Sequence, residues 1–295
     1  MEFKKYILSS LIAFLLYNGQ AGGTAAVSPD YNFSPSEISG FITYLIYNRE
    51  YYRASVEVER LKSYYPDHVS NSAYTASINY LMYKGGAYAS ITAQEPVYTE
   101  DNLSREIAAV FKIDSYLKLK KHNEAQKTAE AISPCSDEFL KRLVVKRELY
   151  FSLYNNSFSR AVDKEDFPNN YNELFRYSDY IHNMKKDPWK GLVSGIIPGM
   201  GYVYAGESGT GIVAMIVIGL GAAITTVSYR NSMDSFALLS GTVTSLFYGG
   251  SIIGGYRETL RYNNNLMERL DLRLQRDLEF DRDTDDIFIK FGIKN

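Results

Sequence analysis

Hydrophobic residues are unevenly distributed along the chain and divide it into three parts. A short apolar run covers residues 6–17, a charged and tyrosine-rich region covers residues 36–165, and two long apolar runs cover residues 209–229 and 235–256. In the middle part, apolar residues recur at helical spacing. The first example has one apolar face made of Ile38, Phe41, Ile42, Leu45 and Ile46. We therefore expect an all-α chain.

The middle part also contains a repeat. A leucine recurs every 36 residues, at Leu45, Leu81, Leu117 and Leu153. An alanine follows each leucine by eight or nine positions, at Ala54, Ala89, Ala125 and Ala161. Turn-forming residues fall in the same phase, at 48–50, 84–86, 121–123 and 155–157. A fixed period of this size is typical of stacked helical hairpins, so we predict a helical-hairpin solenoid over residues 30–186 with these leucines and alanines in its packing.

The repeat resembles the tetratricopeptide family, in which a large residue and a turn precede a small alanine and then a proline. Here Pro66 ends the second helix of the first copy. The resemblance implies that the repeats bind a peptide or a protein surface along a concave groove. A rigid spacer without a ligand is the alternative.

The start of the chain has the features of a secretory signal. Lys4 and Lys5 precede the first apolar run, and small residues follow it. Gly19 and Ala21 fit the small residues of a cleavage site, so we predict a signal peptide over residues 1–21. An uncleaved anchor and a buried helix are the alternatives.

The two long apolar runs predict a transmembrane hairpin. Each is long enough to cross a bilayer, and a short polar loop joins them. From residue 191 to residue 256 the charged residues are Glu207, Arg230 and Asp234. A buried hairpin of a soluble protein is the alternative. Residues 191–206 are shorter and interrupted by Pro198, so we expect a re-entrant or interfacial element there, with Trp189, Tyr202 and Tyr204 at headgroup depth.

Residues 187–256 resemble the TM2-like membrane modules of uncharacterised bacterial envelope proteins. The matching residues include the small-xxx-small pair Gly250 and Gly254. The full signature is Pro198, Gly199, Gly201, Tyr204, Gly206, Gly209, Gly211, Gly250 and Gly254. The resemblance implies a component embedded in membrane lipid. We further expect that the glycine-rich hairpin can form a homo-oligomer.

Residues 257–295 predict an amphipathic helix and a polar tail. Leucines recur every four residues at Leu266, Leu270, Leu274 and Leu278, with a charged face that we expect to be solvated. The acidic residues 281–286 lack the glycine and glutamate of a calcium loop, so they predict a polar turn. A short strand is expected at residues 287–291.

Candidate chemistry adds little to this picture. A net charge of -2 gives no reason to expect nucleic acid as a partner. The single Cys135, expected to be buried, excludes a disulfide or a cysteine-ligated zinc site. The three histidines, His68, His122 and His182, lie far apart. We therefore expect no enzyme activity, cofactor or metal.

The function expected from these features is a membrane-anchored scaffold or assembly factor that binds a protein partner of the cell envelope through its repeats. A transport or protein-insertion component acting through the hairpin is the alternative, although the spans lack the charged residues usual in transport paths. The signal peptide places the repeats in the periplasm, beside the inner membrane. The flanking cations Lys185, Lys186, Lys190, Arg257 and Arg261, against Arg230 in the loop, favour the opposite orientation.

Overall fold

The computed structural model describes residues 33–94, 101–132, 135–157 and 171–293, and within them it contains helices and no strand. The all-α prediction is confirmed. The predicted signal peptide and Ala161 lie outside the described residues. The helices of the N-terminal part are α2 (Pro35–Tyr47), α3 (Tyr51–Tyr64), α4 (Asn71–Lys84), α5 (Tyr88–Ala93), α6 (Asn102–Lys118), α7 (His122–Ile132), α8 (Glu138–Asn155) and α9 (Asn172–Met184). They are followed by α10 (Pro188–Ser194), α11 (Met200–Ala205), α12 (Ser208–Arg230), α13 (Asp234–Asp277) and α14 (Phe280–Phe291).

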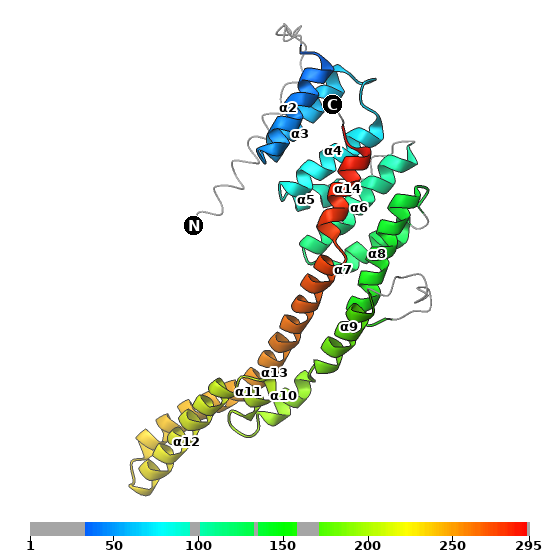
Figure 1. Ribbon diagram of the computed structural model, residues 1–295. Helices are drawn as coiled ribbons and strands as arrows, with labels where there is room; N and C mark the ends of the chain where they lie inside the picture. Colours follow the sequence, from blue (N-terminus) through cyan, green and yellow to red (C-terminus); the bar gives the residue numbers. More distant parts are fainter. Residues whose placement is uncertain (1–32, 95–100, 133–134, 158–170, 294–295) are drawn as a thin grey trace.

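Helices α2 to α9 cover the region of the predicted repeats and are called the repeats below. Each of them contacts the preceding or the following helix (Figure 1). Helix α2 starts with a capping box: the Ser34 hydroxyl accepts the Glu37 N–H, and the Glu37 carboxylate accepts the Ser34 N–H at 2.7 Å. Further along, α4 contacts α3, α5 and α6, and α6 contacts α7 and α8. Many contacts in this part therefore join helices that are close to one another in the sequence.

The helix-ending turns share one geometry. Each contains a residue at positive φ: Arg49, Gly86, Lys120 and Asn156. In each, the next residue donates its N–H to the carbonyl five positions back, at Leu45, Met82, Tyr116 and Ser152, over 2.9 to 3.1 Å. This 6→1 bond is typical of a left-handed helix C-terminus. The turns fall at the phase that the sequence repeat predicts.

The leucines of the repeat are all buried, and so are Ala54 and Ala125. Ala89 is instead exposed, contrary to the packing role predicted for it. It lies in the first turn of the six-residue α5, and Ile91 fills the buried position of that helix.

Helix α13 is one continuous helix of 44 residues, about 66 Å long at 1.5 Å per residue. It starts beside α12, at the end of the molecule farthest from α2, and extends to the repeats (Figure 1). The predicted second span and the predicted amphipathic helix are therefore parts of the same helix. Leu266, Leu270 and Leu274 of its C-terminal half, and Leu278 directly after it, are buried in one core with residues of α6 to α9.

The tail differs from the prediction. Residues 281–286 are not a polar turn, and residues 287–291 are not a strand, because both belong to α14. Helix α14 packs against α4 and α6, which completes the hydrophobic core of the first repeats. Ile287 is fully buried, and the Phe288 ring stacks on the Tyr80 ring at a centroid distance of 4.3 Å. The sequence pattern is ambiguous here because α14 takes its partners from residues about 200 positions earlier.

Candidate repeat cavity and membrane module

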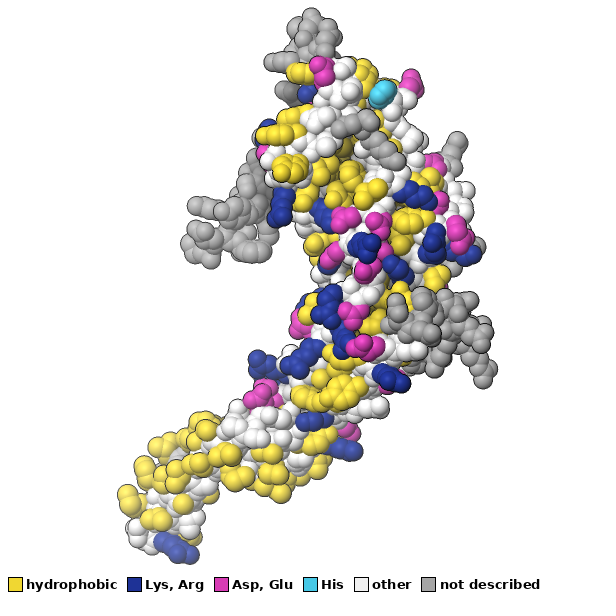
Figure 2. All heavy atoms as spheres, viewed as in Figure 1, with side chains coloured by type: hydrophobic (Ala, Val, Ile, Leu, Met, Phe, Trp, Pro, Cys, Tyr) yellow, Lys and Arg dark blue, Asp and Glu magenta, His cyan; other side chains and the backbone are white. Residues whose placement is uncertain are grey.

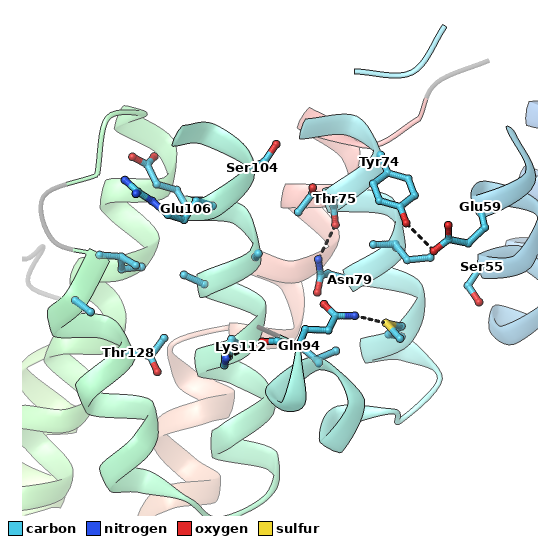
Figure 3. Close-up of a pocket in the computed structure, with 18 of the residues that line it drawn as sticks. Ser55, Glu59, Tyr74, Thr75, Asn79, Gln94, Ser104, Glu106, Lys112 and Thr128 are labelled. Carbon is cyan, nitrogen blue, oxygen red and sulfur yellow. Dashed lines mark hydrogen bonds between the residues drawn. The ribbon is translucent and has the colours of Figure 1, made fainter. Parts of the chain in front are cut away.

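A cavity of about 880 Å³ lies among helices α3 to α7 (Figure 3). Its apolar lining includes Ile78, Ile91 and Ala109, all buried. Glu59 and Lys127, both exposed, are among its charged lining residues. Its size lies within the range of small-ligand pockets or a peptide side-chain cluster.

Most polar groups of the cavity already have partners. The Tyr74 hydroxyl donates to the Glu59 carboxylate at 2.6 Å, and burial together with this carboxylate raises the pKa of Tyr74. The Lys112 ammonium donates to the Gln94 carbonyl at 3.0 Å. Glu106 is buried and accepts the Ser136 N–H at 2.7 Å, which anchors the start of α8.

Among the described lining residues, Asn79 has a buried polar atom without a partner. Its side-chain nitrogen donates to the Thr75 carbonyl at 2.8 Å, whereas its Oδ1 has no hydrogen-bond partner. The residue is 2% exposed, and its side chain projects between α4 and α6 (Figure 3). A buried amide oxygen without a donor costs free energy. Because this oxygen is itself buried, an occupant of the cavity would reach it only after a neighbouring side chain moved.

An aromatic surface lies on α2 and α3, beside the cavity. Tyr47 and Tyr52 are 86% and 82% exposed, and Tyr44 and Tyr64 are exposed as well. Tyr52 lies one helical turn before Val56, which is exposed and lines the cavity, so the aromatic surface meets the cavity at this point. Exposed tyrosines are enriched in protein interfaces, because they bury a large area at little cost in conformational entropy.

A buried ion network fastens α14 to the repeats. The Arg147 guanidinium of α8 donates to Asp114 of α6 at 2.6 and 3.0 Å and to Asp283 of α14 at 2.8 Å. All three residues are at most 3% exposed. Burial alone would lower the pKa of Arg147, but the two carboxylates outweigh it and raise this pKa. The Arg147 charge also lies 4.5 Å from the Phe280 ring centroid.

Other polar contacts also join α13 and α14 to the repeats. The Tyr83 hydroxyl and the Lys118 ammonium both reach Asp281, at 3.0 and 3.1 Å. Further contacts join Lys146 to Asp283, Lys84 to Asp285, Lys290 to Asp137, Lys120 to Glu268, and Tyr150 to Asp271. The acidic residues of α14 are therefore largely paired with the repeats. On the face of α13 predicted to be solvated, Arg257, Arg261 and Arg269 are exposed, as expected, and Asp271 is buried.

Some residues of the predicted TM2-like signature lie in a glycine-packed junction of α10, α11 and α13, which is called the module below. A Cβ added at Gly201 would lie 2.8 Å from both the Gly191 carbonyl oxygen and the Gly255 Cα. Gly199 has φ 79°, which glycine alone adopts without strain, and a Cβ there would collide with the Gly211 backbone. Gly199, Gly201 and Gly211 belong to the predicted signature, whereas Gly191 and Gly255 are not among the signature residues.

The other signature residues have different surroundings. Gly254 lies under the Tyr202 ring, so Tyr202 packs inside the module. Gly206 ends α11 at φ 105°. By contrast, a Cβ at Gly209 or Gly250 would meet nothing within 4 Å. The close packing expected at Gly250 is thus absent within this chain.

Pro198 and Tyr204 complete the signature. Pro198 lies in the turn between α10 and α11 and is half-buried. The Tyr204 hydroxyl accepts the Asp187 N–H at 3.2 Å, which joins the end of α11 to the start of α10.

Helices α12 and α13 meet along small and hydroxyl-bearing residues. A Cβ at Gly221 would collide with Thr244, and one at Gly241 would lie 3.2 Å from Thr225. The Thr225 hydroxyl donates to the Ser240 hydroxyl at 3.1 Å. This combination of close backbones and hydroxyl bonds is typical of helix pairs in membranes.

Both helices are long and apolar enough to cross a membrane. Many of their large side chains are exposed, and Figure 2 shows apolar side chains gathered over the visible face of this end of the molecule. The exposed residues include Ile212, Val213, Ile216, Val217, Leu220, Ile224, Val227, Leu238, Leu239, Leu246, Phe247 and Ile253. A groove of about 630 Å³ between the helices is lined by apolar and small polar residues. An exposed apolar surface of this extent indicates contact with lipid or protein.

Other candidate chemistry is sparse. In the ranges that the structure describes, no three His, Cys, Asp or Glu residues are grouped as a metal site would require. Cys135 is half-buried rather than buried, and burial together with Glu106 raises the pKa of its thiol to about 11. His122 lies within 3.1 Å of the Tyr150 hydroxyl, and burial lowers the pKa of this histidine.

No known protein family, curated protein sequence or solved structure matches this chain.

Proposed function

We propose that this protein is a scaffold or assembly factor of the bacterial cell envelope, anchored in the membrane by α12 and α13. In this proposal α2 to α9 are a tetratricopeptide-like solenoid that holds a protein partner. The observation that carries the proposal is the 880 Å³ cavity, which meets a surface of exposed tyrosines. Helix α13 joins this part of the chain to the apolar helices.

A protein segment suits this surface better than a small substrate does. The tyrosines of α2 and α3 would cover the partner's apolar side chains. Within the cavity the Tyr74 hydroxyl already donates to Glu59 and the Lys112 ammonium to the Gln94 carbonyl, so these side chains are held by structural hydrogen bonds. The proposal therefore assigns no enzymatic activity, cofactor or metal.

The membrane anchor is proposed from the exposed apolar surface of α12 and α13 and from the TM2-like residues. The transport or insertion alternative would use the groove between these two helices. Its lining residues carry no charge, which makes it a poorer path for ions or polar solutes than for an acyl chain.

We test the partner surface by filling the cavity. Ala131 is an exposed lining residue of α7, and Ala131→Trp would occupy the cavity without disturbing the core. Ala89→Trp is the matched control, because Ala89 is exposed and does not line the cavity. A photo-crosslinking amino acid at Val56 should yield one defined envelope protein adduct in otherwise wild-type chain.

Ala131→Trp should reduce this adduct at least fivefold, and Ala89→Trp should leave it unchanged. If Ala131→Trp leaves the adduct intact, or if no protein is captured at Val56, the repeats do not bind a partner through this cavity.

We further propose that the repeats lie in the periplasm, because a signal peptide at residues 1–21 would export them before the spans insert. Ser63 on α3 and Ser232 in the loop after α12 are exposed reporters. In a Cys135→Ser background, an impermeant maleimide added to spheroplasts should label Ser63→Cys and not Ser232→Cys. The reverse pattern would place the repeats in the cytoplasm.

A further inference from the structure

The neck of the molecule, where the apolar helices meet the repeats, is held together by side chain to backbone bonds. Asn263 of α13 accepts the Lys186 N–H at 2.9 Å and donates to the Lys186 carbonyl at 2.7 Å. The Trp189 and Tyr256 rings meet edge to face at 5.7 Å. Residues 185–190 therefore lie alongside residues 256–263 of α13, and together they form one level of the molecule that is about 10 Å deep, seven residues at 1.5 Å per residue.

Cations without ion-pair partners surround this level. Lys185, Lys190 and Arg257 are exposed, and none of them makes an ion pair in the described part of the chain. We call these three residues the neck collar. Arg261, one helical turn beyond Arg257, lies 3.7 Å from Glu258. Figure 2 shows Lys and Arg side chains gathered where the apolar surface begins.

The acidic residues near the neck do not neutralise the collar. Asp187 accepts the Trp189 N–H at 2.9 Å and caps α10. Glu258 is paired with Arg261, and Glu207 lies at the start of α12. The Lys186 ammonium, in turn, donates to the Tyr204 carbonyl at 2.8 Å and is therefore directed into the protein.

The collar lies at the height of a membrane surface. Asp234 and Arg257 are 23 residues apart in one helix, about 35 Å at 1.5 Å per residue. This length slightly exceeds the hydrocarbon thickness of a bilayer, roughly 30 Å. Below the collar, α10 and the following turn expose Val193, Ile196 and Ile197. Trp189 is 66% exposed at the same level as the cations, where tryptophan favours the headgroup region.

We propose that the neck collar binds the phosphate groups of anionic phospholipids and so fixes the depth of the protein in the bilayer. The inference rests on the proposed membrane anchor. Exposed, unpaired cations at a fixed height would attract anionic headgroups, whereas a zwitterionic headgroup carries its own ammonium beside the phosphate.

Trp189 makes the proposal directly measurable, because it is the single tryptophan of the chain and lies within the collar. The full-length protein is reconstituted in phosphatidylcholine vesicles doped with dansyl-labelled phosphatidylglycerol or dansyl-labelled phosphatidylcholine. Energy transfer from Trp189 should reach half its maximum at a mole fraction of the anionic probe roughly tenfold lower than for the zwitterionic probe. This preference should decrease as salt concentration rises.

Two triple variants distinguish an effect of the collar residues from an effect of the protein's net charge. The triple variant Lys185→Gln, Lys190→Gln, Arg257→Gln should lose the preference. The control Lys121→Gln, Lys141→Gln, Arg142→Gln removes the same charge from exposed positions on the repeats and should keep it. Equal transfer to both probes in the wild-type protein, or an unchanged preference in the collar variant, would overturn the collar while leaving the anchor in place. A wild-type protein recovered outside the vesicles, with no transfer to either probe, would refute the anchor as well.

Discussion

Arg147 illustrates the residue scale, because a fully buried cation is tolerated here only with two carboxylates around it. Such a network contributes little net stability compared with apolar packing, but removing one member leaves the others unpaired in a low dielectric. Its partners come from α6 and α14, so the network also selects which face of α14 packs inward. A single residue thus specifies the placement of a whole helix.

Arg147→Met should lower the free energy of unfolding by about 3–5 kcal/mol, because Asp114 and Asp283 would remain buried without a counter-charge. Arg147→Lys should also destabilise, since one ammonium cannot reproduce the guanidinium fork. Chemical denaturation in detergent micelles measures both. Lys141→Met, which removes an exposed cation of the same helix, is the control and should stay within about 0.5 kcal/mol of the wild type.

The docking of α14 should depend on pH through Asp137 and Asp281. Burial alone would raise the pKa of each, but the Leu140 N–H and Lys290 lower that of Asp137, and Lys118 and Tyr83 lower that of Asp281. A carboxyl whose pKa is lowered by folding adds stability above its unfolded pKa, about 3.9, and loses it as the pH falls through the folded value.

We therefore expect the double variant Asp137→Asn, Asp281→Asn to be less stable than the wild type at pH 7. The difference in unfolding free energy should shrink as the pH falls below about 4, where the wild-type carboxyls also become neutral. A series of denaturation curves between pH 7 and pH 3 measures this. A difference that stays constant over the series would show that the two carboxylates are not linked to folding.

At the scale of elements, the contrast between two glycines of α13 shows how the membrane module is packed. Gly255 touches the backbones of α10 and α11, whereas Gly250 faces open space. Both are helical at negative φ, so their difference lies in the surroundings alone. Close backbone contact at Gly255 lets the short helices α10 and α11 lie directly on α13.

Gly255→Ala should destabilise the module by about 1–3 kcal/mol, because its Cβ would lie 2.6 Å from the Gly191 carbonyl oxygen. Gly250→Ala should be neutral or slightly stabilising, since alanine favours a helix by roughly 1 kcal/mol over glycine. Thermal unfolding in micelles compares the two. Equal effects of both substitutions would contradict the role given to Gly255.

At the scale of the whole molecule, α13 and α14 close the chain on itself. The chain leaves the repeats at α9, turns through α10 to α12, and returns along α13 to contact α8, α9 and, through α14, α4 (Figure 1). The repeats and the apolar helices therefore share one long helix and are mechanically coupled. A partner held by the repeats would be held at a fixed distance from the apolar end.

A chain ending at Lys186 should fail to form a stable monomer, although it contains every predicted repeat. It would lack Asp283 opposite Arg147, Asp271 opposite Tyr150, and the leucines of α13. Circular dichroism and size-exclusion chromatography should show partial helix and aggregation. Addition in trans of a peptide covering residues 257–293 should restore a folded complex. A cooperatively folded monomer without that peptide would contradict this dependence.

The helices and their turns were largely predictable from local sequence. Helical spacing of apolar residues, the Pro66 stop and the turn residues act within about ten positions of one another, so the buried Leu45, Leu81, Leu117 and Leu153 could be read directly. The partners of α14 could not be read. From the sequence alone, its acidic residues are expected to be solvated. In the structure they contact Tyr83, Lys118 and Arg147, and these contacts depend on the whole fold.

The sequence by itself determined the all-helical class, the phase of the turns, and the presence of two helices apolar enough to cross a membrane, because periodicity, capping and hydrophobicity are local properties. The tertiary structure decided that the tail is a helix docked on the repeats, that Ala89 is exposed, and which glycines carry close contacts. It also brought the cations of residues 185–190 and 257 to one level. These outcomes depend on contacts between residues far apart in sequence. The free energy of such contacts cannot be inferred from a local sequence pattern.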